Sequence, residues 1–260
     1  MSHKQWCCWA ALFAIVGAVA LVSCSTITRT AFVPPEIPGA QYVGNKACTD
    51  CHAAITRVFP ASPHARIHFS DNTAGQTGCE SCHGPGSLHI QSGGSAKLIF
   101  NPGKDPASCF QCHLETHAEF SLPQHHPVIE GRMNCIQCHD PHGSDIMKPK
   151  GGLAMARLNE SCAQCHREQT RPVVFEHEAM REGCSTCHNP HGSVNRKLLT
   201  DNDSNLCLRC HAQNPGTLAG TGQIFIGSID HTAFMRQGSC WAAGCHTAVH
   251  GSNVDPHLIY

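Results

Sequence analysis

The chain has little charge and no stretch of ordinary core-forming sequence. Only 14% of its 260 residues are charged, against roughly 25% in typical soluble domains. No basic run occurs, so nucleic acid is not an expected partner. The apolar residues are interrupted throughout by 23 Gly and 16 Pro, and neither an amphipathic helix of normal length nor an alternating strand pattern recurs. These scarcities exclude a domain built around one large apolar core.

After residue 24, the chain also lacks any cysteine outside a repeated motif. Of 19 cysteines, 16 fall in eight motifs, and the other three, Cys7, Cys8 and Cys24, lie in the first 24 residues. Seven motifs are C-x-x-C-H, and the eighth is stretched to Cys240-Trp-Ala-Ala-Gly-Cys245-His246. A disulfide framework or a zinc ribbon would leave the histidine after every second cysteine unexplained.

C-x-x-C-H is the attachment motif of haem c, in which two thiols form thioethers and the histidine binds the iron. The sequence therefore predicts eight covalently attached haem c groups. The predicted thioether cysteines are Cys48, Cys51, Cys79, Cys82, Cys109, Cys112, Cys135, Cys138, Cys162, Cys165, Cys184, Cys187, Cys207, Cys210, Cys240 and Cys245. The predicted proximal iron ligands are His52, His83, His113, His139, His166, His188, His211 and His246. We expect mainly short α-helices and loops wrapped around a linear haem array, with little or no β-sheet.

The number of histidines in the chain predicts that a second histidine binds every iron. The chain has 21 His, of which eight follow attachment cysteines and His3 lies in the leader, so twelve remain for eight open positions. Only 6 Met are present, including Met1, and none recurs in register with the motifs. An iron with two histidine ligands offers no position to a small substrate, which favours electron transfer over catalysis.

Repeated placement near the motifs selects the distal ligands. Some histidines trail a motif closely, as His142 and His191 do in two Pro-His-Gly-Ser segments, and these two are expected to bind a neighbouring haem rather than their own. Others precede a motif by seven to nine residues, as His126 and His177 do. The predicted distal ligands are His64, His89, His126, His142, His177, His191, His231 and His250. The histidines left as surface groups or propionate partners are His68, His117, His125 and His257, with His68 and His125 open as alternatives to His64 and His126.

An internal repeat organises the body. Residues 126–166 and 177–211 are two copies of a two-haem module, spaced 45 to 49 residues apart. Each copy joins a motif followed by Pro-His-Gly-Ser to a plainer C-x-x-C-H. A repeated haem pair is a natural unit for a linear array.

The first 23 residues read as an export signal. Lys4 precedes an apolar run from Trp6 to Val22, and Leu21-Val22-Ser23-Cys24 resembles a lipobox, which predicts lipidation of Cys24. An ordinary signal peptide with a chance cysteine and a retained membrane anchor stay open as alternatives, although the run is short for a membrane span. Residues 24–45 are predicted to be a lipid-anchored tether, and residues 46–260 the octahaem domain.

The chain resembles the periplasmic multihaem cytochromes of outer-membrane porin–cytochrome conduits (MtrA/DmsE type). The resemblance covers most of residues 45–255 and is carried by Cys82-His83-Gly-Pro-Gly-Ser-Leu-His89, Phe175-Glu-His177, Cys187-His188-Asn-Pro-His191-Gly-Ser-Val-Asn195 and His246-Thr-Ala-Val-His250-Gly-Ser-Asn253. Members of that family thread a haem wire into a large β-barrel. The chain departs from the decahaem type in having eight sites, a stretched last motif and a lipobox.

The resemblance implies extracellular electron transfer between the periplasm and the cell exterior. The expected partners are an outer-membrane β-barrel porin, an extracellular multihaem cytochrome and periplasmic electron-donor cytochromes, and the expected location is the periplasmic face of the outer membrane or within it. The alternatives are a periplasmic or surface electron shuttle without a porin, and a multihaem reductase. A non-enzymatic role is expected because no C-x-x-C-K motif occurs and neither tyrosine, Tyr42 or Tyr260, adjoins a motif.

Overall fold

The computed structural model describes residues 33–66, 78–143, 159–211, 223–241 and 244–260. The predicted signal peptide, Cys24 and the tether up to residue 32 lie outside the described residues, as does His68. The chain divides into two units, Met1–Val33 and Pro34–Tyr260, and the second carries all the elements below.

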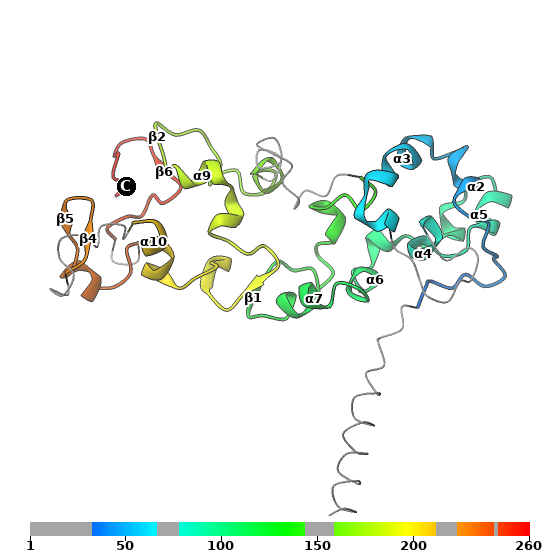
Figure 1. Cartoon of the computed structure of the whole chain (residues 1–260), viewed down its shortest axis with the longest axis horizontal. Helices are drawn as coiled ribbons and strands as arrows, with labels where there is room; N and C mark the ends of the chain where they lie inside the picture. The colour runs from blue at the N-terminus through cyan, green and yellow to red at the C-terminus, as the bar shows by residue number, and fades with distance from the viewer. Residues whose placement is uncertain (1–32, 67–77, 144–158, 212–222, 242–243) are drawn as a thin grey trace, which may run out of the picture. The chain divides into compact units, whose positions relative to one another are not determined.

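The helices are short, as the frequent Gly and Pro predict. The α-helices are α2 (Lys46–Thr49), α3 (Ala53–Val58), α4 (Cys79–His83), α5 (Ser87–Gln91), α6 (Ala107–Phe110), α7 (Leu114–Phe120), α9 (Ala179–Glu182) and α10 (Asp203–His211) (Figure 1). Single 3₁₀ turns are η1 (Phe59–Ala61), η2 (Pro63–Arg66), η3 (Ala96–Leu98), η4 (Pro102–Lys104), η5 (Cys135–Gln137), η6 (Cys184–Thr186), η7 (Arg196–Leu198) and η8 (Phe234–Arg236). Gly84 and Gly183 follow α4 and α9 with φ of 69° and 102°, a backbone region that glycine enters without a steric penalty. None of the helices within the described residues is long and apolar enough to cross a bilayer.

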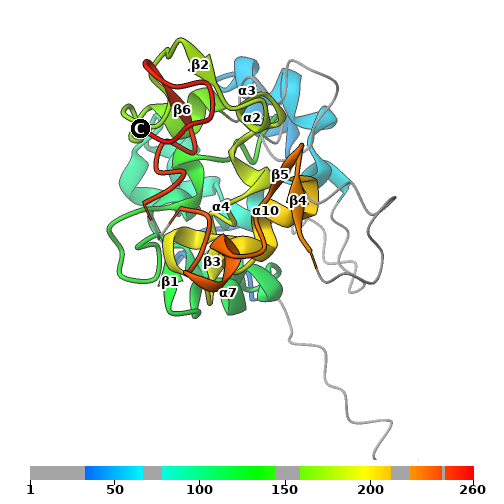
Figure 2. The same cartoon turned by 90° about the vertical axis from the view of Figure 1, so that its left-hand side faces the viewer.

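The strands described form three antiparallel pairs of two residues each. β1 (Gln124–His125) pairs with β3 (Gly192–Ser193), β2 (Phe175–Glu176) with β6 (Gly251–Ser252), and β4 (Phe225–Ile226) with β5 (Ile229–Asp230). Figure 2 shows β2 beside β6 and β4 beside β5. The prediction of short helices and loops with little sheet is confirmed.

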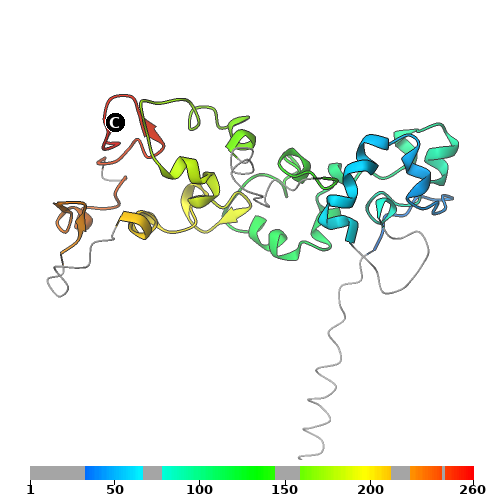
Figure 3. The same ribbon diagram turned by 45° about the horizontal axis from the view of Figure 1, so that its top comes forward.

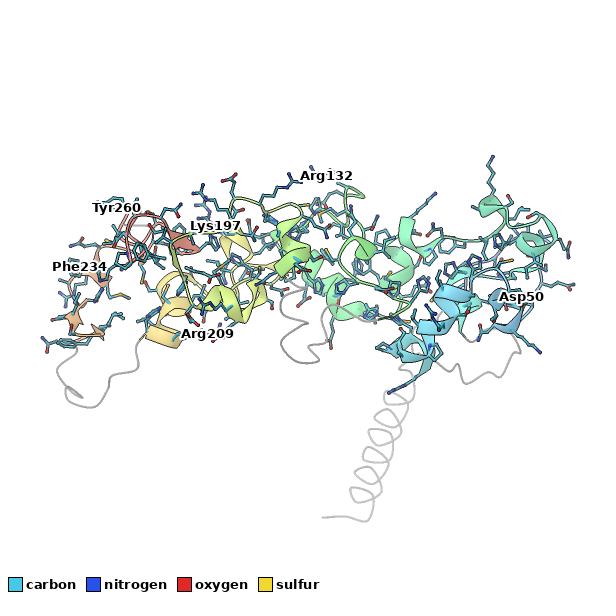
Figure 4. All side chains as sticks on the ribbon, turned by 90° about the horizontal axis from the view of Figure 1, so that it is seen from above. Asp50, Arg132, Lys197, Arg209, Phe234 and Tyr260 are labelled. Carbon is cyan, nitrogen blue, oxygen red and sulfur yellow. The ribbon has the colours of Figure 1, made fainter. Side chains whose placement is uncertain are left out.

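The apolar core of the protein part is very small. Among the described residues, the buried hydrophobic side chains are Phe110, Phe120 and Val128, with Met133 packed against them. Large apolar side chains lie exposed elsewhere, including Phe234 at 50% and Tyr260 at 77% (Figure 4). So small a core fits the expectation that short helices and loops wrap around haem groups.

Residues 41–44, which belong to the predicted tether, are hydrogen-bonded to residues of the predicted octahaem domain. The carboxylate of Glu80, 2% exposed, accepts hydrogen bonds from the backbone N–H groups of Val43, Gly44 and Gly86 at 2.7–3.2 Å. The N–H of Gln41 donates to the Ser87 hydroxyl over 2.8 Å. Figures 1 and 3 show this blue segment beside the teal helices α4 and α5. The second unit begins at Pro34 and so includes the last residues of the predicted tether.

Candidate haem-binding sites

One backbone hydrogen bond closes the attachment motifs. At five of the C-x-x-C-H motifs the histidine N–H donates to the carbonyl of the first cysteine over 2.9–3.0 Å. Such an i to i−4 bond forms one helical turn, which places the cysteine and the histidine on one face. The five histidines are His52, His113, His139, His166 and His188.

The stretched motif closes in the same way. The N–H of His246 donates to the carbonyl of Cys240 over 3.0 Å, although two more residues separate them. Gly244, with φ of 77°, lies within the enlarged turn. The last motif thus keeps the relation between first cysteine and histidine that the seven regular motifs have.

Each histidine of the seven regular motifs lies opposite one predicted distal histidine. The ring centroids of each pair are 6.0 or 6.2 Å apart. In chain order of the motifs, the pairs are His52–His89, His83–His142, His113–His64, His139–His191, His166–His126, His188–His250 and His211–His177.

The shared separation fits two ligands of one metal ion better than it fits ring packing. Interplanar angles range from 8° to 89°, so the rings share no stacking geometry. Metal–nitrogen bonds of about 2 Å on each side set ring centroids about 6 Å apart and leave each ring free to rotate. Within the part of the chain that the structure describes, no three His, Cys, Asp or Glu side chains gather as a site for a bare ion. The paired rings beside paired cysteines therefore fit haem c.

The histidine pairs are organised by a junction that occurs three times. At each junction, Nδ1 of the earlier histidine approaches the carbonyl of the residue just before the later histidine, at 2.6–3.2 Å. The junctions join His64 to Pro141-His142, His126 to Pro190-His191, and His177 to Val249-His250. Strand pairs β1–β3 and β2–β6 hold the second and third junctions, because β1 and β2 lead into the earlier histidine and β3 and β6 follow the later one. Each junction serves two consecutive motifs: the second and third, the fourth and fifth, or the sixth and seventh.

The first cysteines of consecutive motifs form a second set of links. Burial, and next the adjoining Cys79 thiol, raises the pKa of Cys48 to about 11. A hydrogen bond between the thiols of Cys109 and Cys135 raises the pKa of Cys109. The two other pairs of this kind are Cys162 with Cys184 and Cys207 with Cys240. These contacts join motifs one and two, three and four, five and six, and seven and eight.

The second cysteines of the remaining neighbouring motifs lie close enough to influence one another electrostatically. Burial raises the pKa of Cys82, and the nearby Cys112 thiol adds to the shift. The corresponding neighbours later in the chain are Cys138 with Cys165 and Cys187 with Cys210. The eight motifs therefore follow one another in space in the order of the sequence.

The structure separates the two candidates His125 and His126. Both ring nitrogens of His125 are occupied, Nδ1 by the Leu122 carbonyl at 2.6 Å and Nε2 by Glu130 at 2.8 Å. The hydrogen bond with Glu130 raises the pKa of His125, which favours a protonated ring that cannot bind a metal. His126 instead faces His166. Two other histidines left over by the sequence also lie elsewhere, since His117 stacks on Phe110 and His257 contacts Asp255.

His231 is not brought to a partner histidine. Among the described residues, its ring packs against Phe234 with centroids 5.8 Å apart, and its Nδ1 contacts the Ile229 carbonyl at 3.0 Å. His246 is in none of the seven ring pairs, and its Nδ1 donates to the His257 carbonyl over 2.7 Å. Among the described residues, therefore, no pair of facing histidine rings matches the predicted second ligand at the last motif.

Hydrogen bonds orient the paired rings for binding through Nε2. In most of the pairs where a partner of Nδ1 is resolved, that partner is a backbone carbonyl, as for His83 with Phe100 and His188 with Lys197. Burial lowers the pKa of His83, His211 and His250, which keeps these rings neutral as metal ligands require. His191 differs, because its Nδ1 meets the carboxylate of Glu119. Glu119 lies in no sequence motif.

Comparisons with known proteins agree with these sites. A family model described as "Doubled CXXCH motif" matches residues 125–171 and 177–216, the two copies of the repeat. The chain is 34% identical over 215 residues to "Multiheme cytochrome MtrA" of Shewanella baltica, covering 80% of this chain and 58% of that protein. It is 30% identical over 201 residues to "C-type polyheme cytochrome OmcB" of Geobacter sulfurreducens, covering 64% of this chain and 25% of that protein. "C-type polyheme cytochrome OmcC" of the same species is 26% identical over 267 residues, covering 86% and 34%.

The attachment motifs and these matches define the chain as a multihaem c-type cytochrome that binds haem c through its C-x-x-C-H motifs. Within that class it is a cytochrome of the MtrA type. It spans only part of the length of its relatives, at most 58%.

Proposed function

We propose that this protein carries electrons between the periplasm and the cell exterior through eight haem c groups, inside an outer-membrane porin–cytochrome complex. The succession of the eight motifs in chain order is the observation that carries the proposal. The three junctions and the four hydrogen-bonded pairs of first cysteines together link each motif to the next. Haem c, when bound, supplies the Fe(III)/Fe(II) couple for one-electron transfer.

The residues of each motif have distinct roles in this proposal. The two cysteines would hold haem c covalently, and the following histidine and the opposite ring of its pair would bind the iron. Backbone carbonyls on Nδ1 hold the rings in place, so little rearrangement accompanies a change of charge. Two histidines at each of seven sites would leave no position on the iron for a substrate, which supports electron transfer rather than a reductase.

The eighth motif is proposed to hold haem c through Cys240, Cys245 and His246. His231 is the proposed second ligand, and its ring has to leave Phe234 to reach this position. The hydrogen bond that closes the motif supports attachment, because it matches the bond of the regular motifs.

The need for a porin follows from the solvent properties of a bilayer. The hydrocarbon core is about 30 Å thick, and open backbone loops and propionates cannot face lipid. A chain of short helices and loops can therefore cross the bilayer only inside a surrounding protein.

The proposed partners are a β-barrel porin, periplasmic electron donors and an extracellular multihaem cytochrome. The chain is proposed to be exported and lipid-anchored through Cys24 at the outer membrane. The competing function is that of an electron shuttle that works without a porin.

Reconstitution in liposomes tests the proposal. Vesicles that contain this protein with its porin should reduce a trapped dye from an external donor, and vesicles with either protein alone should not. Removing the fourth haem by Cys135→Ala with Cys138→Ala should stop the transfer, because it interrupts the succession. Transfer that survives this change, or that needs no porin, would favour a shuttle.

A further inference from the structure

One histidine of the seven ring pairs, His191, contacts the carboxylate of Glu119. Nδ1 of His191 lies 2.9 Å from Oε2 of Glu119. Backbone carbonyls hold Nδ1 of the ring-paired histidines His64, His83, His89, His126, His177 and His188. His191 is thus set apart from these six by a charged acceptor.

Asn189 holds the carboxylate in this position. Its Nδ2 donates to Oε1 of Glu119 over 3.1 Å, and its Oδ1 accepts the backbone N–H of His191 over 3.1 Å. Both oxygens of Glu119 are therefore bound, one by the histidine ring and the other by the amide next to it. The Glu119 and Asn189 side chains, with the ring and backbone N–H of His191, form a closed ring of hydrogen bonds.

The backbone around Glu119 is fixed by packing. Phe120, the next residue and the last of α7, is 5% exposed and packs against the His191 ring with centroids 5.3 Å apart. A Cβ on Gly192 would come within 1.9 Å of the Glu119 carbonyl oxygen. Only glycine lets the two segments approach this closely, so the carboxylate is presented by a rigid element rather than by a loop.

The other copy of the repeat provides an internal comparison. Asp140 stands where Asn189 stands, and its Oδ1 accepts the N–H of His142 over 3.0 Å, as Asn189 does for His191. A carboxylate has no N–H to offer a second carboxylate. The first copy therefore keeps the local turn without the group that would anchor a glutamate.

A charged acceptor on Nδ1 changes the metal-binding properties of the ring. It draws the Nδ1 proton toward the carboxylate and makes Nε2 a stronger donor, which stabilises Fe(III) over Fe(II). A hydrogen bond to a charged group is roughly twice as strong as one between neutral groups. The difference corresponds to about a tenfold change in a one-electron equilibrium constant.

We propose that Glu119 is a positioning residue that lowers the reduction potential of the fourth haem through His191. This inference rests on the proposed haem at Cys135 and Cys138 with His139 and His191 as axial ligands. One haem within the succession is thereby set to a lower potential through the hydrogen bond between Glu119 and its histidine ligand.

Two variants of the full haem-loaded protein test the inference. Glu119→Gln removes the charge. Glu119→Gln with Asn189→Asp reverses donor and acceptor between the two side chains, so every hydrogen bond and the net charge are kept while a neutral oxygen meets His191. Glu115→Gln is the matched control, because Glu115 is an exposed carboxylate of the same helix.

The readouts are the number of haems by intact mass, a potentiometric titration and the electron paramagnetic resonance spectrum of the ferric protein. In both Glu119 variants one of the one-electron steps should move to higher potential by about tenfold in its equilibrium constant, about 59 mV. One low-spin signal should shift with it, and Glu115→Gln should change neither.

An unchanged titration in the double variant, or an equal shift in Glu115→Gln, would overturn the inference. Loss of the fourth haem from both Glu119 variants would also overturn it, because Glu119 would then serve attachment instead. The proposed function fails separately, if the unmodified protein lacks haem at Cys135 and Cys138 or has a high-spin iron there.

Discussion

The N–H of His246 donates to the carbonyl of Cys240 over 3.0 Å, the same bond that closes the shorter motif from Cys109 to His113. The two additional residues therefore enlarge the turn without separating the histidine from the first cysteine. Haem attachment needs that relation, because thioether and axial bonds converge on one macrocycle.

The first prediction concerns the number of haems attached to the chain. The intact mass should exceed that of the processed polypeptide by eight haems, and Cys240→Ala with Cys245→Ala should lower the count to seven. Seven haems in the unmodified protein would show that the stretched motif is not an attachment site.

Adjacent histidines offer a matched test of axial ligation. His126→Ala should convert one low-spin haem to a high-spin haem that binds carbon monoxide, because the ring opposite His166 is lost. His125→Ala should leave all haems low-spin, since His125 is held by Leu122 and Glu130. Absorption and magnetic resonance spectra distinguish the two, and the reverse pattern would assign the ligand to His125.

The last motif is tested through His231. If its ring leaves Phe234 to bind the eighth iron, His231→Ala should produce one high-spin, carbon monoxide-binding haem, and His257→Ala should not. An unmodified protein that already binds carbon monoxide at one haem would contradict the proposed ligand and reopen the reductase reading.

Glu80 gives a prediction about stability. Glu80→Gln places an amide N–H against backbone donors of Gly44 or Gly86, at a cost of about 1.5–3 kcal/mol in the free energy of unfolding. Surface variants such as Glu115→Gln usually change this free energy by no more than about 0.5 kcal/mol. Denaturant titration should give this difference, and faster proteolysis within residues 35–44 should accompany it. Equal stability of the two variants would show that Glu80 does not hold this segment.

The attachment sites were predictable because a thioether motif is complete within one turn of chain. The pairing of the histidines was not, because it depends on segments such as those of His188 and His250 meeting in the folded chain. The hydrogen bonds that hold residues 43–44 were not predictable, because one buried side chain, Glu80, binds backbone groups that carry no sequence pattern. Glu119 likewise has no motif, and the replacement of Asp140 by Asn189 between the repeat copies was the signal that could have found it.

Diffraction from the haem-loaded protein at the iron absorption edge tests the central claim most directly. It should place eight irons in the order of the sequence, seven of them between the paired rings, with the fourth between His139 and His191. Irons bound by other histidine combinations, or a haem out of sequence order, would contradict the account.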